Sequence, residues 1–171
     1  MMKCAVLCNG PSRNLFNSSD GYHYIIGCNV PWTKVDATVV LDENVIDRWA
    51  KEPELITVPT YFSRKAWMHT DSIKKRSFFE KYFIDIVDIL PEYDTSGHNA
   101  VKCAIKRGAV EIDIYGCDSW FEQTIVSYTH KYFKNLNPDD SKKHVIGWRK
   151  RWQEIIDGNP TVKINFIGVS K

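Results

Sequence analysis

The sequence predicts an α/β protein, a single Rossmann-like domain with a mostly parallel sheet and helices on both faces. Strand-like apolar runs alternate with helical or loop connections, without a long hairpin series or an internal repeat. The 171 residues suit one continuous core, and no linker-like composition divides 1–171. The segment Tyr93–Asp118 reads as half of a βαβ unit, with a small-residue turn, a helix ending near Gly108 and a strand at Val110–Tyr115.

The other elements follow from apolar runs and their periodicity. The remaining strands are expected at Lys3–Cys8, His23–Cys28, Ala37–Leu41, Leu55–Val58, Phe83–Leu90 and Val162–Val169. Two further helices are expected, a short one through Val45, Ile46 and Trp49 and a long one at His144–Asp157 that Gly158 ends. Residues 60–77 have no clean periodicity, and the polar, aromatic residues 119–143 predict a long surface loop or lid with partial helix.

Composition and charge narrow the possible functions. The chain is 43% hydrophobic and 26% charged, as in ordinary globular proteins. Its net charge of +2 does not demand a nucleic-acid partner, and no apolar run is long enough to span a membrane. Five cysteines without a CxxC motif or an export signal predict reduced thiols in the cytoplasm. Cys4 and Cys8 are expected to be small buried side chains rather than metal ligands.

Four residues directly after the first strand, Asn9, Gly10, Pro11 and Ser12, form a candidate phosphate loop. A glycine lets backbone amides approach a phosphate closely, and Ser12 can cap a following helix while donating to a ligand. Neither GxGxxG nor GxxxxGK[ST] occurs. A simple turn is the alternative interpretation.

Polar residues also follow other strands, where ligands bind in open α/β sheets. Asn29 is expected either to read a nucleobase edge or sugar hydroxyl, or to form an Asx-turn before Pro31. Asp118 is a candidate catalytic or sugar-binding acid, with turn formation as the rival interpretation.

The turn formed by Thr95, Ser96 and Gly97 stands where a helix begins. Backbone amides at a helix amino terminus bind anions, so these residues are a candidate anion cradle. The alternative is that Asp94 or Thr95 simply caps the helix.

His144 is a candidate general base. It is expected at the start of the last long helix, outside its apolar stripe and beside Lys142 and Lys143. Neighbouring cations and a helix amino terminus would lower its pKa, and a neutral imidazole can accept a proton. A plain surface histidine is the alternative, and His130 is held in reserve.

The order of these motifs resembles the bacterial sialyltransferases of glycosyltransferase family 42. The motifs are CNGPS after the first strand, GCN after the second, TSG opening a helix, EIDIYGCD closing the next strand and HVIG before a late helix. The chain is also similar to proteins of the 6-hydroxymethylpterin pyrophosphokinase type. The likeness runs in short patches from Cys8 to about Ile156, and TSG–helix–(I/V)xIYGxD is its most specific part.

The resemblance implies a Rossmann-like transferase that makes one inverting displacement on a CMP-linked sugar without a metal. His144 would match the family's general base, which deprotonates the acceptor hydroxyl. The residues that would line the nucleotide and the donor sugar are Asn9, Gly10, Ser12, Asn29, Ser96, Gly97, Gly116, Cys117 and Asp118.

Three features depart from the family pattern. The family has tyrosines shortly after GxD that hold the leaving phosphate, whereas this chain has Trp120 there and no tyrosine before Tyr128. Tyr128, Tyr132 or Lys131 would have to replace them. Tyr93 stands where those sialyltransferases carry an arginine, which weakens the case for sialic acid as donor, and the chain is short for an acceptor-binding tail.

The sequence therefore predicts a metal-independent transferase, most simply a glycosyltransferase. No cofactor or metal is expected, and its partners would be a nucleotide-activated donor and a hydroxyl-bearing acceptor: a glycan, a metabolite or a modified nucleic acid. Two alternatives remain: pyrophosphoryl or phosphoryl transfer to a pterin-like or nucleoside acceptor, which usually needs Mg²⁺, and nucleotide binding without catalysis.

Overall fold

The computed structural model describes residues 1–89, 94–121 and 138–168, except for the side chains of 138–144. A seven-stranded sheet with the order β5-β4-β3-β2-β1-β6-β7 forms its centre, and all neighbouring strands are parallel. The strands are β1 (Met2–Leu7), β2 (Tyr24–Cys28), β3 (Ala37–Val40), β4 (Thr60–Ser63), β5 (Phe83–Val87), β6 (Ala109–Tyr115) and β7 (Lys163–Ile167). The α/β class and the parallel sheet are as the sequence predicts.

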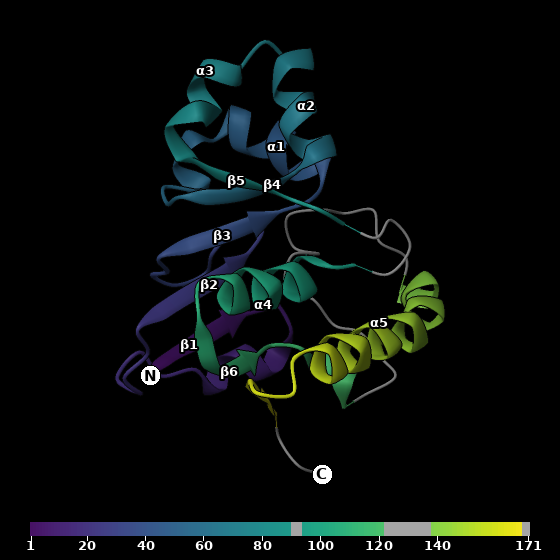
Figure 1. Ribbon diagram of the computed structural model, residues 1–171. Coiled ribbons are helices and arrows are strands. Elements are labelled where there is room, and N and C mark those ends of the chain that lie inside the picture. Colours follow the sequence, from purple (N-terminus) through teal and green to yellow (C-terminus); the bar gives the residue numbers. More distant parts are fainter. Residues whose placement is uncertain (90–93, 122–137, 169–171) are drawn as a thin grey trace.

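The direction in which strands are added reverses at β1. Strands β2 to β5 are added one after another on one side of β1. The chain then crosses back, and β6 pairs with the other side of β1. The element that makes this return is α4 (Ser96–Lys106) (Figure 1). In open parallel sheets, loops diverge at such a reversal and leave a crevice beyond the carboxyl ends of the two strands. The fold therefore places its expected ligand site between the ends of β1 and β6.

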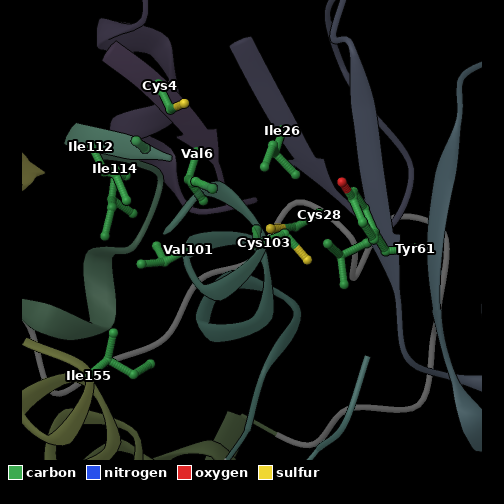
Figure 2. Close-up of a cluster of buried hydrophobic side chains, with 14 of the residues drawn as sticks. Cys4, Val6, Ile26, Cys28, Tyr61, Val101, Cys103, Ile112, Ile114 and Ile155 are labelled. Atoms are coloured by element: carbon green, nitrogen blue, oxygen red, sulfur yellow. The ribbon is translucent and has the colours of Figure 1, made fainter. Parts of the chain in front are cut away.

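One face of the sheet is covered by α4 and by α5 (Pro138–Gly158) (Figure 1). Figure 2 shows this core, in which Val101 and Cys103 of α4 and Ile155 of α5 pack with side chains from the strands. Alternate residues of each strand face this layer, for example Val6 of β1 and Ile112 of β6. The apolar positions of the helix predicted to end near Gly108 thus bury the face that its periodicity indicates.

The other face of the sheet is covered by helices over one half and by loop residues over the other. Three helices lie over β3 and β4: α1 (Glu43–Lys51), α2 (Arg64–Ser72) and α3 (Arg76–Phe79). At their centre Trp49 is fully buried, and its ring stacks on Phe62 with centroids 6.1 Å apart. Over β1 and β6 the cover is a layer of loop aromatics, with Phe16 packed edge-on against Tyr115. Helices therefore lie on both faces, as predicted.

The predicted strand at Leu55–Val58 is wrong. Pro53–Leu55 forms a short 3-10 helix, and the strand is β4, which begins after Pro59. The apolar character of this stretch has another cause, because Ile56 is a fully buried loop residue of the helix-covered core. Proline cannot donate to a sheet ladder, but its carbonyl can accept: Pro59 accepts from the amide of Thr38 and leads into β4.

The last helix begins earlier than predicted. It starts at Pro138, so the segment 138–143, expected in the loop, is helical, and His144 lies inside α5 rather than at its amino terminus. The missed signal is Pro-Asp-Asp, because proline at the first helical position followed by acidic residues is typical of a helix start. The rest of the predicted lid, 122–137, lies outside the described residues. None of the helices in the described ranges is long and apolar enough to cross a bilayer.

Candidate functional site

Four segments that the sequence singles out meet at the reversal point of the sheet. They are the loop after β1, the residue after β2, the start of α4 and the turn after β6. Because the carboxyl ends of parallel strands lie at one edge, this convergence follows from the topology. The side chains do not merely lie near one another; they are hydrogen-bonded across segments.

Ser12 and Asp118 join the loop after β1 to the turn after β6. The backbone amide of Ser12 donates to Asp118 Oδ2 at 3.0 Å, and its hydroxyl donates to the same oxygen at 3.1 Å. The hydroxyl oxygen of Ser12 in turn accepts from the amide of Gly116 at 3.0 Å. Ser12 is therefore a buried bridge, whereas the carboxylate of Asp118 keeps lone pairs for a further donor.

Replacing Ser12 by alanine is expected to destabilise the protein by about 2 kcal/mol, because it leaves the buried amide of Gly116 and one Asp118 lone pair without their partner. Urea unfolding of Ser12→Ala measures the loss. The matched control is Ser19→Ala, at an exposed serine that donates to Asn17 Oδ1 through its backbone amide rather than its hydroxyl. Equal stability of the two variants would contradict the bridging role of Ser12.

Gly10 and Gly116 allow the two loops to touch backbone to backbone. The amide of Gly10 donates to the carbonyl of Gly116 at 2.8 Å. A Cβ on Gly10 would lie 2.5 Å from that carbonyl oxygen, and one on Gly116 would lie 2.5 Å from the carbonyl oxygen of Cys8. Pro11 opens the short 3-10 helix Pro11–Leu15 (η1) that follows. The amides of Gly10 and Ser12 are thus used inside the protein, and an anion must find other donors.

Those donors exist at the start of α4. Thr95 is the N-cap, and its side-chain oxygen accepts from the amide of His98, so the capping interpretation of this turn is correct. The amides of Ser96 and Gly97, the first two of the helix, donate to no other residue in the described ranges. Gly97 lets the helix start lie against β1, because a Cβ there would be 2.8 Å from Cys8 Sγ. Amides that are free at a helix amino terminus can bind an anion, so this turn stays a candidate anion site.

Two asparagines connect β1, β2 and α4. Asn9 Nδ2 donates to the carbonyl of Cys28 at 3.0 Å. Asn29 has a left-handed backbone with φ of 57°, and its Oδ1 accepts from the hydroxyl of Ser96 at 3.1 Å. The Asn29 side chain therefore reaches the helix start rather than closing a local Asx-turn.

His98 is the residue of this region that sequence reasoning missed. Its ring is fully buried against Trp152, with centroids 4.1 Å apart. Nδ1 accepts from the amide of Thr95 at 2.9 Å, which leaves the proton on Nε2 to be donated to the carbonyl of Trp148 at 3.1 Å. Burial lowers the pKa of His98 to about 4, so the ring is neutral at pH 7. His98 ties the start of α4 to α5.

Asp94, just before the helix, does not cap it. Its buried carboxylate pairs instead with Lys102 Nζ and Arg151 Nε, each at 2.7 Å. These ion pairs add a second link between α4 and α5 beside that of His98. The start of α4 is consequently held from both sides.

Three thiols lie beneath the site. Cys8 Sγ is 3.9 Å from Cys28 Sγ. Donation of a hydrogen bond to Cys8, together with burial, raises the pKa of the Cys117 thiol well above its ordinary value. Cys28 and Cys117 are buried and Cys8 is partly buried, while Cys4 on β1 is fully buried, as expected. The parts of the chain that are described contain no metal-holding group of three His, Cys, Asp or Glu side chains.

Several predicted site residues lie outside this description. Tyr128, Lys131 and Tyr132, the candidate phosphate-holding residues, fall within 122–137. The backbone of His144 belongs to α5, but its side chain is not among the described groups. The helix-end argument for a low His144 pKa no longer applies, because the amino terminus of α5 is at Pro138.

Comparison with known proteins does not add to this picture: no family model, curated protein or solved structure matches the chain. The geometry of the site must therefore carry any functional argument.

Proposed function

We propose that the protein is a transferase that binds a nucleotide-activated donor, most simply a nucleotide sugar, at the carboxyl ends of β1 and β6. The observation that carries the proposal is the start of α4, where the amides of Ser96 and Gly97 donate to no residue in the described ranges. This helix start lies beside the residues that follow β1 and β2, and the loop after β1 is bonded to the turn after β6. A phosphate ester at these amides would interact with the positive end of an 11-residue helix.

Asp118 would bind the sugar ring of the nucleotide. Its carboxylate is oriented by Ser12 and has acceptor capacity left for a ribose hydroxyl. Asn29 and Asn9 would line the other side of the site, because both anchor the end of β2. Fixed amides and hydroxyls would then stabilise the charge that develops on the departing phosphate, in the role that a metal ion has in other transferases. The acceptor would be a hydroxyl-bearing molecule, with His144 as the proposed base.

A thermal-shift screen tests donor binding with CMP, UMP, GMP, ADP and their sugar conjugates. A ligand at 100 times its dissociation constant adds about 2.7 kcal/mol to the unfolding free energy, so one base class is expected to raise the melting temperature selectively. Asp118→Asn, which keeps the hydrogen bonds from Ser12 but loses the charge, is expected to reduce the response. Asp20→Asn, at an exposed aspartate, is the control.

The screen also separates the alternatives. A response that persists in EDTA supports the metal-independent transferase, whereas a response that needs Mg²⁺ supports pyrophosphoryl or phosphoryl transfer. His144→Ala should abolish group transfer and leave nucleotide binding intact. Unchanged transfer in this variant would show that His144 is not the general base. Absence of a response to every nucleotide would contradict the proposal.

A further inference from the structure

A separate hollow of about 560 Å³ opens at the same edge of the sheet, beyond β4 and β5. Its walls come from the start of α1, from α2 and from the residues that follow β5. It shares no lining residue with the site at β1 and β6. The volume is in the range of small-molecule sites.

An oriented imidazole lines this hollow. Nε2 of His69 lies 2.7 Å from Asp47 Oδ1, so the carboxylate fixes the direction of the ring. Nδ1 lies 4.0 Å from Glu43 Oε1, and the other oxygen of Glu43 is 2.9 Å from Lys65 Nζ. A side chain held in this way by its neighbours is preorganised for a ligand, because little freedom remains to be lost on binding.

The charged residues that line the hollow are two cations, Arg64 and Lys65, and two carboxylates, Glu43 and Asp88. Lys65 and Glu43 neutralise one another, whereas Arg64 forms no ion pair with any residue in the described ranges. Arg64 and Lys65 are the first two residues of α2, whose first turn has no acidic side chain. Cations at the positive end of a helix are electrostatically unfavourable. An anion in the hollow would relieve this local conflict.

The remaining wall is apolar. Met68 is 63% exposed, and it lines the hollow together with Val87 and Ile89. Asp88 also lines it and offers an acceptor for a hydrogen-bond donor. An apolar wall with a few convergent polar groups is the usual composition of a site for small organic molecules.

We propose that this hollow is a second small-molecule site, for an organic anion whose carboxylate or phosphate pairs with Arg64. Its apolar body lies against Met68 and Val87, and a polar substituent contacts His69. The assignment does not depend on the function proposed for the site at β1 and β6, because the two sites have no residue in common.

Amide NMR titration with phenyl phosphate, benzoate and the neutral analogue benzyl alcohol tests this assignment. Saturable shifts are expected at residues 64–69 and 87–89 with an anion and not with benzyl alcohol, and the better anion identifies the preferred group. Arg64→Gln should raise the dissociation constant of that anion by about tenfold or more, the order expected for one lost charge-assisted hydrogen bond. Met68→Ser should weaken the binding of phenyl phosphate but not that of inorganic phosphate.

The matched control is Lys75→Gln, which removes an exposed cation from the same stretch of chain outside the hollow. It should leave the dissociation constant unchanged. Because Arg64 and Lys75 are both exposed, neither substitution disturbs the core. Absence of saturable shifts, equal affinity of Arg64→Gln and the unmodified chain, or equally tight binding of benzyl alcohol would overturn the proposal.

Discussion

The protein is expected to lose about 2 kcal/mol of unfolding free energy between pH 7.5 and pH 5 because of His98. Burial lowers the pKa of this histidine from 6.5 to about 4 in the folded state. Between these values the unfolded chain binds a proton that the folded protein does not, so stability falls as the pH falls. The loss begins near pH 6.5 and is complete near pH 4. Urea unfolding at a series of pH values measures it.

His98→Gln isolates this effect. Glutamine can accept from the amide of Thr95, as glutamine does at the same position of other capping boxes, but it does not titrate. The variant is expected to be less stable at pH 7.5 and to lack most of the decline toward pH 5. His23→Gln, at an exposed histidine, should keep the full decline. The same slope in His98→Gln as in the unmodified chain would show that another group causes it.

The fold could be predicted where the pattern of one segment is sufficient. The change from a helical to an alternating period within 96–115 predicts α4 and β6, since Gly108 with φ of 93° allows the turn between them. The pattern misleads at Ile56, which is apolar because it fills the core from a loop. Burial and secondary structure are different properties, and a single apolar run does not separate them.

The sequence could predict that the candidate site residues lie close together, but not which hydrogen bonds join them. Parallel strands bring their carboxyl ends together, which suffices to place the loop at Asn9–Ser12 beside Asp118. The pairing of Ser12 with Asp118 joins residues 106 positions apart, and the bond from His98 to Trp148 spans 50. Such partners depend on how α5 and the loops pack, which local periodicity does not contain. The oriented His69 was missed for the same reason, because Asp47 belongs to another helix.

Gly116→Ala is expected to destabilise the protein by about 3 kcal/mol or more, the sum of backbone strain and a forced shift of packed atoms. Gly116 has φ of 72°, and an added Cβ would lie 2.5 Å from the carbonyl oxygen of Cys8 and 3.1 Å from the amide nitrogen of Gly10. These are backbone atoms at the ends of strands and cannot swing aside. Urea unfolding gives the loss.

Gly21→Ala separates strain from contact. Gly21 has nearly the same φ, 75°, but an added Cβ would meet no atom within 4 Å. Gly21→Ala should therefore lose only the unfolding free energy that corresponds to backbone strain, roughly 1–2 kcal/mol. The additional loss of unfolding free energy in Gly116→Ala measures how closely the loops after β1 and β6 are packed. If contact between these loops also shapes the ligand site, Gly116→Ala will lose the thermal-shift response to nucleotides, whereas Gly21→Ala will keep it. Equal losses of unfolding free energy in the two variants would show that the two loops have room to move apart.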